Sequence, residues 1–373
     1  LASNDRNQEI LGQELKVGNE IVAAMRKHIG SESVQDMACG ALWDLALNDR
    51  NKEILGQELK VGKVIVAAMR KHPGSEPVQE NACGALRNLA ANARNKEILG
   101  QEFKVGKEIA AAMRKHTGSE SVQKYACRAL GNLAGNDRNK EILGQELKVG
   151  KEIVAAMRKH RGSESVQEDA CGALMNLAVN DRNQEILGQE LKVGKEILAA
   201  MRKHPGSEAV QRRACGALRN LAGNNARNQE ILGQDLKVGK DIVAAMRKHN
   251  GSERVQVIAC SALRHLAGNN ARNQEILGQE LHVGEEIVAA MRKHSGSEGV
   301  QEKGCGALWK LAINDRNKEI LGQELEVGKE IVAAMRKHPG SNVQKQACRA
   351  LENLACNATV TKILRDQGAR EAV

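Results

Sequence analysis

Cysteines and histidines are the residues of this sequence with the strongest potential for chemistry, and both recur at a fixed interval. Eight of the nine cysteines occupy one repeated position, in the pattern ACGAL: Cys39, Cys83, Cys127, Cys171, Cys215, Cys260, Cys305 and Cys348. Such thiols could form disulfides or, with histidines such as His204, bind zinc. However, no second ligand pair stands at zinc spacing, and packed helices lie about 8–10 Å apart, too far for a disulfide. We therefore expect inert core cysteines, no metal, and a reducing compartment.

A glycine-rich stretch from Gly56 to Lys63, GQELKVGK, imitates a phosphate-binding loop. It has five residues between its glycines, and Val64 stands where such a loop needs serine or threonine. The stretch also recurs in nearly every repeat, whereas catalysis needs a nucleophile and a base gathered at one site that differs from the rest. The sequence thus predicts no enzyme activity and no cofactor.

The composition limits the classes of partner. The formal net charge of +10 permits binding to acidic partners. Aromatic residues make up only 1% of the chain, so a surface that stacks nucleic-acid bases is poorly supplied and nucleic acid is an unlikely partner. No apolar run has membrane length, and the start does not resemble a signal peptide. We expect a cytoplasmic protein, or alternatively a nuclear one.

The cysteine position belongs to a longer block, SVQEDACGALMNLAVN at Ser165–Asn180, which recurs throughout the chain. The period is 44 residues, with two steps of 45 and a last step of 43. A regular period of this length is typical of a solenoid in which each repeat buries its apolar face against its neighbours. We expect one array over residues 1–373, with a partial ninth repeat at 357–373. Its eight full repeats start near Asn4, Asn48, Asn92, Asn136, Asn180, Asn224, Asn269 and Asn314.

Each repeat has the pattern of three helices. In one repeat, 183–191 begins with residues suited to N-capping and ends near a Val-Gly break at 193–194. A second helix at 195–204 places apolar residues on one face. A Gly-Ser pair, such as Gly206-Ser207, predicts the end of the second helix and the N-cap of the third. The third helix carries ACGAL, and no period-two alternation favours strands.

A short helix followed by two longer ones, with ALxNLA closing the third, resembles the armadillo repeat. Units of the form IVAAMRKHPGSxxVQxxACGALRNLA are also similar to the armadillo region of leucine-rich-repeat kinases. The resemblance covers essentially the whole chain and implies an all-α, right-handed α-solenoid of three-helix repeats. One departure is that the usual Gly-Gly between the first two helices is a single glycine in KVGK, which affects the length of the first helix.

The resemblance also implies a function, because armadillo arrays typically bind extended peptides in a concave groove lined by third helices. There an asparagine side chain contacts the peptide backbone. The matching residues are Asn88, Asn132, Asn176, Asn220 and Asn353, with Asp44, His265 and Lys310 as replacements. A tryptophan four residues earlier is common in peptide-binding members, but this chain has glycine, serine or arginine there. The aromatic half of that clamp is therefore missing from the pattern.

Comparison of the repeats with one another indicates the same face of the third helix. The residue seven positions before the asparagine differs most between repeats, and the residue just before it also varies. We hypothesise a groove with a basic and apolar centre, flanked by Glu168 and Asp169. Its residues are Arg212, Arg213, Arg219, Ile258, Arg264, His265 and Trp309. The alternative is that exposed positions simply drift.

Every second helix ends in Arg-Lys-His, as at Arg202–His204. Cations near a helix C-terminus are stabilised by the helix dipole by about 0.3–1 kcal/mol each, which is enough to explain them. The alternative is a basic ladder for acidic partners.

The sequence therefore favours a non-catalytic scaffold that binds extended, acidic peptide segments of other proteins. Two alternatives stay open. One is a structural or consensus-designed array without a dedicated partner, and a weaker one is electrostatic binding of nucleic acid or acidic membranes. Because neither end carries an obvious polar cap, end-to-end self-association is also expected.

Overall fold

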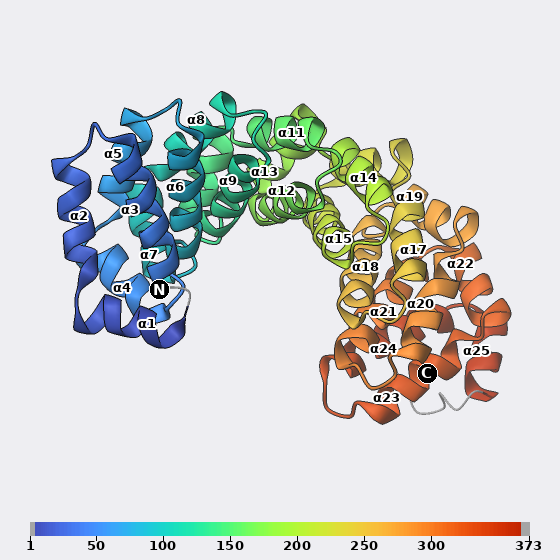
Figure 1. Ribbon diagram of the computed structural model, residues 1–373. Coiled ribbons are helices and arrows are strands. Elements are labelled where there is room, and N and C mark those ends of the chain that lie inside the picture. The colour runs from blue at the N-terminus through green and yellow to red at the C-terminus, as the bar shows by residue number, and fades with distance from the viewer. Residues whose placement is uncertain (1–3, 367–373) are drawn as a thin grey trace. The chain divides into compact units, whose positions relative to one another are not determined.

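The computed structural model describes residues 4–366, and within this range the ordered elements are helices, with no strand (Figure 1). The chain divides into two compact units, Leu1–Ile186 and Leu187–Val373, called here the N-terminal and C-terminal units. Each unit is built from the same three-helix repeat.

The first helix of each repeat is a turn of α-helix continued by a turn of π-helix. These pairs are α1 (Asp5–Glu9) and η1 (Ile10–Glu14), α4 (Asp49–Glu53) and η2 (Ile54–Glu58), α7 (Ala93–Glu97) and η3 (Ile98–Glu102), α10 (Asp137–Glu141) and η4 (Ile142–Glu146), α13 (Asp181–Glu185) and η5 (Ile186–Glu190), α16 (Ala226–Glu230) and η6 (Ile231–Asp235), α19 (Ala271–Glu275) and η7 (Ile276–Glu280), and α22 (Asp315–Glu319) and η8 (Ile320–Glu324).

The second helices are α2 (Val17–Lys27), α5 (Gly62–Lys71), α8 (Val105–Lys115), α11 (Gly150–Lys159), α14 (Gly194–Lys203), α17 (Gly239–Lys248), α20 (Val283–Lys293) and α23 (Val327–Lys337). The third helices are α3 (Glu32–Leu45), α6 (Glu76–Leu89), α9 (Glu120–Leu133), α12 (Glu164–Leu177), α15 (Glu208–Ala222), α18 (Glu253–Leu266), α21 (Glu298–Leu311) and α24 (Asn342–Ala355). A last helix, α25 (Ala358–Asp366), follows.

An asparagine ladder joins the first helices of successive repeats. In the N-terminal unit, Asn139 on α10 donates from Nδ2 to Lys96 O at 2.8 Å and to Leu133 O at 3.2 Å. Its side chain occupies the space where a Cβ atom on Gly100 would lie, so only glycine fits in that π-helical turn. The same pairing of glycine and asparagine recurs between Gly144 and Asn183. The ladder therefore sets the distance between neighbouring first helices.

The link between first and second helices turns through a lysine. Lys148 has φ 51°, in the left-handed region that glycine adopts most readily, whereas Val149 beside Gly150 is right-handed, with φ −59°. In the repeat analysed by sequence, the first helix ends at Glu190 and Lys192 takes the same conformation at φ 52°. The first helix thus ends slightly before the predicted Val-Gly break.

The turn between second and third helices is held by serine and glutamine rather than by glycine. Ser119 Oγ accepts from Val122 N at 3.2 Å, which confirms the predicted N-cap. Gln123 Nε2 donates to Met113 O and His116 O, both at 2.9 Å, and so satisfies carbonyls that the helix end leaves free. The second helix ends just before the Gly-Ser pair, as predicted, but in most repeats the glycine is not left-handed. Among the described glycines, only Gly340 has a positive φ, at 76°.

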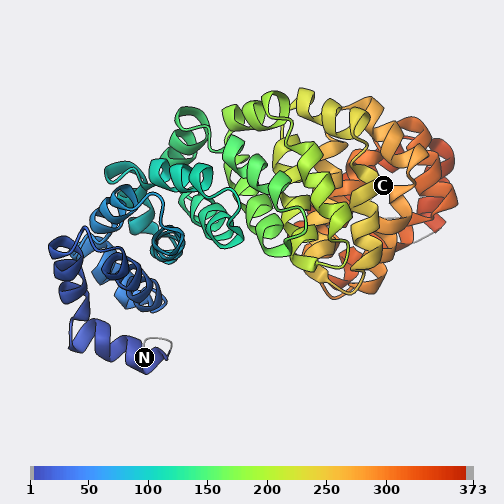
Figure 2. The same ribbon diagram turned by 45° about the horizontal axis from the view of Figure 1, so that its top comes forward.

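The core lies along the third helices, which pack one on the next in each unit (Figures 1 and 2). Val166, Cys171 and Leu174 on α12 are fully buried, and similar residues recur on the other third helices. Burial of each such leucine side chain contributes about 1.5–3 kcal/mol to stability. Seven cysteines at the repeated position are free and buried, as predicted. Cys348 on α24 is instead exposed, so the predicted core role is wrong for that residue.

Candidate protein-binding face

The residues predicted to bind a partner lie on the third helices, on a surface that we call the third-helix face. It is formed by the last two turns of each third helix and by the variable residue seven positions before the asparagine. The two units are described separately.

The asparagines of this face already bond the neighbouring repeat. Each donates from Nδ2 to a carbonyl near the C-terminal end of the preceding third helix: Asn88 to Trp43 O at 3.0 Å, Asn132 to Arg87 O at 2.9 Å, Asn176 to Gly131 O at 2.8 Å, and Asn353 to Trp309 O at 3.1 Å. Asn220 Oδ1 accepts from Arg219 Nε at 2.9 Å. Asn88 is buried, whereas the others are partly buried. A peptide could therefore bond only to the remaining amide groups of the partly buried members.

The N-terminal unit has an aromatic pair that the sequence pattern concealed. Trp43 on α3 covers Gly84 on α6 so closely that a Cβ atom there would lie 2.6 Å from the indole ring. The Trp43 ring meets Tyr125 of α9 edge to face, with centroids 4.6 Å apart. Gly84 is the position where peptide-binding armadillo repeats often carry tryptophan. The indole ring over this position comes from the preceding repeat. Glycine stands here in most repeats, with or without a preceding tryptophan, so the sequence held no specific signal for the contact.

Other variable residues of the N-terminal unit form polar contacts across repeats. Arg128 Nη1 lies 2.7 Å from Asp169 Oδ1 and 3.8 Å from Glu168 Oε1. Asn81 Nδ2 donates to Asp36 Oδ1 at 2.6 Å. The two carboxylates predicted to flank the groove are therefore partners of Arg128, and Asp169 is buried.

The C-terminal unit gathers cations around one aromatic ring. Trp309 on α21 has Lys310 Nζ 4.1 Å from its ring centroid, and the guanidinium carbons of Arg349 and Arg264 lie at 4.7 Å and 5.5 Å. Arg264 extends from α18 across Gly306, where a Cβ atom would lie 3.2 Å from its Cδ. We call Arg264, His265, Trp309, Lys310 and Arg349 the Trp309 cluster. Each of these contacts is of cation–π range.

Crowding of these cations shifts their pKa values. Burial lowers the pKa of Lys310, and the charges of Arg264 and Arg349 lower it further. The pKa of Arg264 is lowered by burial and by Arg349, with Glu302 opposing. Burial also lowers the pKa of His265, and the charges of nearby cations lower it further. The hydrogen bond between His265 Nδ1 and Ser261 O, at 2.7 Å, acts in the opposite direction and raises the pKa. The cluster therefore presents concentrated positive charge.

The structure brings together only some of the predicted residues. Arg264, His265 and Trp309 belong to the Trp309 cluster. Arg213 and Ile258 lie six residues before Arg219 and Arg264, roughly 9 Å toward the N-terminal ends of their helices. Arg212 adjoins Arg213, and both are partly buried. Lys310 and Arg349 were not predicted as groove residues, because in the sequence each stands only as a substitution for a family residue, asparagine for Lys310 and tryptophan for Arg349.

The Arg-Lys-His ends of the second helices have structural roles. Arg114 Nη1 pairs with Glu152 Oε1 at 2.7 Å, one repeat further on. His116 Nε2 donates to Pro73 O at 2.9 Å, one repeat back. These contacts between repeats, added to the helix dipole, account for the arginine and the histidine without a ligand.

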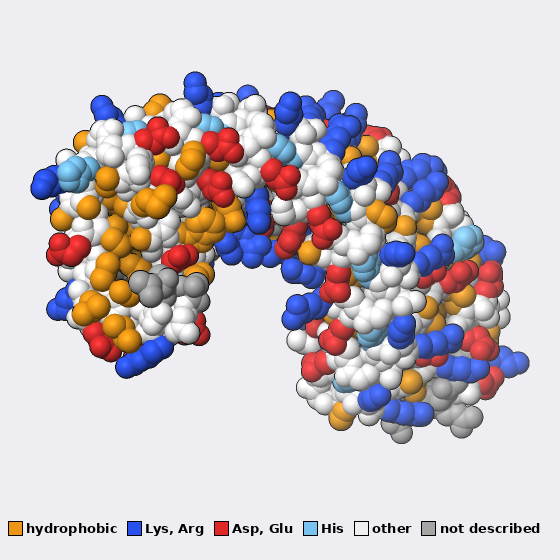
Figure 3. Space-filling view, in the orientation of Figure 1, with side chains coloured by type: hydrophobic (Ala, Val, Ile, Leu, Met, Phe, Trp, Pro, Cys, Tyr) orange, Lys and Arg blue, Asp and Glu red, His pale blue; other side chains and the backbone are white. Residues whose placement is uncertain are grey.

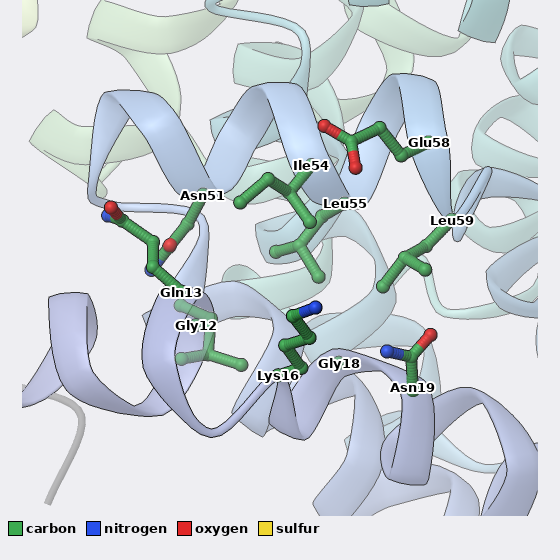
Figure 4. A pocket seen from close by; sticks show the side chains of 11 residues that line it. Gly12, Gln13, Lys16, Gly18, Asn19, Asn51, Ile54, Leu55, Glu58 and Leu59 are labelled. Carbon is green, nitrogen blue, oxygen red and sulfur yellow. The ribbon is translucent and has the colours of Figure 1, made fainter.

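One kind of cavity recurs with the repeat. One of about 190 Å³ lies between η1 and η2, where Lys16, Leu55 and Leu59 face a space left beside Gly12 and Gly18 (Figure 4). The equivalent space is about 370 Å³ next to Gly188 and about 10 Å³ next to Gly100. The crevice thus arises from the glycines of the repeat. Within residues 4–366, no group of histidine, cysteine and acidic side chains could hold a metal ion, and no helix is long and apolar enough to cross a membrane.

Comparisons with known proteins agree with this geometry. A solved structure, from work on a phosphorylation switch that controls the interaction between cadherin and beta-catenin, matches with a TM-score of 0.75. The match covers 97% of this chain and 69% of the other at 17% identity, so it shows the fold. The predicted all-α solenoid of armadillo repeats is therefore confirmed. No curated protein matches the chain. The family model described as the LRRK2 ARM repeat matches residues 1–137 and 134–320, and the chain belongs to that armadillo-repeat family.

Proposed function

We propose that this chain is a non-catalytic scaffold that binds extended acidic peptide segments of other proteins along the third-helix face. The observation that carries the proposal is the distribution of paired charge. First-helix arginines such as Arg138 pair with a glutamate on the same helix, and second-helix arginines such as Arg114 pair with the next repeat. Among residues 4–366, Arg264, Lys310 and Arg349 have no ion pair. An acidic segment would supply the missing carboxylates.

The fold supports this proposal. The matching solved structure concerns an interaction between two proteins, cadherin and beta-catenin, so this architecture serves protein binding there. The aromatic pair Trp43–Tyr125 in the N-terminal unit adds a rigid apolar surface of the kind that anchors interfaces. Buried free thiols support a reducing compartment, the cytoplasm or nucleus.

The test uses fluorescein-labelled 15-residue peptides containing four aspartates or glutamates, with binding measured by fluorescence anisotropy at physiological salt. We expect Arg264→Glu with Lys310→Glu to weaken binding at least tenfold. The matched control, Arg138→Glu with Arg94→Glu, changes the net charge equally on the first helices and should leave the affinity nearly unchanged.

Each other outcome favours a different function. Equal losses in both variants, with affinity falling steeply as salt rises, would favour non-specific electrostatic binding. Absence of binding across the peptide set would favour a structural array without a dedicated partner.

We also propose that two copies of this chain associate end to end through the first repeat. Leu15 is 63% exposed and Met37 is 67% exposed, and apolar side chains gather over this repeat in Figure 3. Val34 of the first repeat is only partly buried, whereas the equivalent residue of the next repeat, Val78, is fully buried. The last repeat of a second copy would cover these exposed residues of the first repeat.

Sedimentation velocity tests this self-association. We expect a concentration-dependent dimer that Leu15→Glu with Met37→Glu abolishes, and a strictly monomeric wild type would contradict the proposal.

A further inference from the structure

A cavity beside the Trp309 cluster differs from the crevices that recur with the repeat. It has a volume of about 390 Å³, within the range of about 300–1,000 Å³ that is usual for sites of small ligands. Arg264, His265, Trp309 and Lys310 form one side, and the loops after α15 and α18 form the other. None of the described residues that line it is acidic.

The loop side of the cavity is built by the two repeats that are one residue longer than the rest. Asn224 and Asn269 are the extra residues, each just before the asparagine that caps the next first helix, and both line the cavity. Asn224 has φ 53°, a left-handed conformation that asparagine tolerates better than most residues. Gln229 is held in the wall by bonds from Nε2 to Ala222 O and His265 O, both at 3.1 Å. Two insertions in sequence thus meet in one cavity.

The donor groups on the helix side suit a small, highly charged anion. Arg264 offers a planar guanidinium that can bond two oxygens at once, and Lys310 offers an ammonium group. Arg349 adds positive charge near the Trp309 ring, 4.7 Å from its centroid. Burial lowers the pKa of Lys310 most, and the charges of Arg264 and Arg349 lower it further. An anion bound between these cations would relieve their repulsion.

We propose that this cavity binds a phosphate monoester carried on the bound segment, that is, a phosphorylated serine or threonine side chain. This inference rests on the proposed function and specifies one subsite of it. A phosphate carries about −1.5 to −2 charges at pH 7 and has three strong acceptor oxygens, whereas a carboxylate carries one charge and two oxygens. A site with two cationic donors, a third cation nearby and neutral asparagines therefore prefers the phosphate.

The probe is N-acetyl-O-phosphoserine amide, added to the full chain carrying Trp43→Phe, which leaves Trp309 as the one tryptophan. Trp309 fluorescence is followed at constant ionic strength, with N-acetylaspartate amide as the carboxylate comparison. We expect saturable binding of the phosphoserine compound at least tenfold tighter than that of the aspartate compound. Arg264→Gln and Lys310→Gln should each weaken it at least tenfold.

Two further variants separate a built site from general positive charge. Arg87→Gln changes the equivalent arginine of the N-terminal unit and should have no effect. Deletion of Asn269 restores the 44-residue spacing and keeps every charge, so weaker binding in that variant supports the cavity. If circular dichroism shows that Arg264→Gln unfolds the chain, Lys310→Gln and the deletion of Asn269 still test the proposed phosphate site.

Equal affinity for the two compounds, or phosphoserine binding that survives both Arg264→Gln and Lys310→Gln, would overturn the inference. These results are distinguishable from failure of the proposed function. If acidic peptides bind but gain no affinity from a phosphoserine, the proposed peptide groove stands and the proposed phosphate site is rejected. If the chain binds phosphoserine but no acidic peptide, the phosphate site stands and the peptide groove is rejected.

Discussion

Replacement of Gly100 by alanine tests whether the asparagine ladder holds the repeats together. A helical Gly→Ala change normally stabilises by about 1 kcal/mol, because alanine loses less backbone entropy. Here the new methyl group would overlap the side chain of Asn139, which is almost fully buried. That side chain cannot simply turn away, since it donates to Lys96 O and Leu133 O.

The magnitude follows from the groups displaced. Loss of two hydrogen bonds costs about 0.5–1.5 kcal/mol each, and the overpacking itself costs about 1–3 kcal/mol. After subtraction of the propensity gain, we expect Gly100→Ala to destabilise the chain by about 1–5 kcal/mol. The assay is urea unfolding followed by circular dichroism. Amide hydrogen exchange at α7 and α10 should show the same loss locally, because repeat arrays need not unfold in one step.

The matched control is Gly118→Ala, in the turn before α9. No atom lies within 4 Å of a Cβ atom there, and Gly118 lacks a positive φ, so we expect a change of at most about 0.5 kcal/mol. The double variant Gly100→Ala with Asn139→Ala should be no less stable than Asn139→Ala alone, because the overlap is gone. If Gly100→Ala were as stable as Gly118→Ala, the ladder would not be a structural constraint.

Three further predictions concern strain, thiol chemistry and pH. Lys148→Gly should stabilise the chain by about 0.5–1 kcal/mol, because the left-handed strain of about 1–2 kcal/mol at this lysine exceeds the entropy cost of glycine. An unchanged or lower urea midpoint would contradict this prediction. Ellman's reagent at pH 8 should titrate Cys348 and Cys356 rapidly, whereas buried thiols such as Cys83, whose pKa burial raises to about 12, should react only after unfolding. Burial lowers the folded-state pKa of His265, so as pH falls through the ordinary histidine value of 6.5 the unfolded chain binds this proton before the folded chain does. The free energy of unfolding should therefore decrease below that pH, and should decrease less in His265→Gln. The urea midpoints of both chains at about pH 7.5 and 5.5 measure this difference.

Local rules of the chain predicted the helices well. The asparagine before each first helix and the serine before each third helix act as N-caps, as at Asn136 and Ser119. Pro77 lies in the first turn of α6, where no backbone bond is lost. These features depend on residues within one turn of each other, so one repeat is enough to recognise them.

Contacts between repeats were harder to predict, because they join residues 35 to 45 positions apart. The bond from Asn139 to Lys96 and the cover of Gly84 by Trp43 are of this kind. The left-handed lysine in KVGK was also missed, because nothing local favours it over glycine. Glycine also stands at the position of Gly84 in repeats that lack a preceding tryptophan, so comparison of the repeats does not reveal that contact.

The same contacts bear on whether the variable positions of the third helices drift. Trp43 packs against Gly84 and Arg128 pairs with Asp169, so these residues of the third helices make contacts with a neighbouring repeat. Such variation needs no ligand to explain it. The Trp309 cluster is different, because among the described residues its cations form no ion pair and they repel one another. Glu302 offsets part of this repulsion at Arg264, and a bound anion would offset more of it.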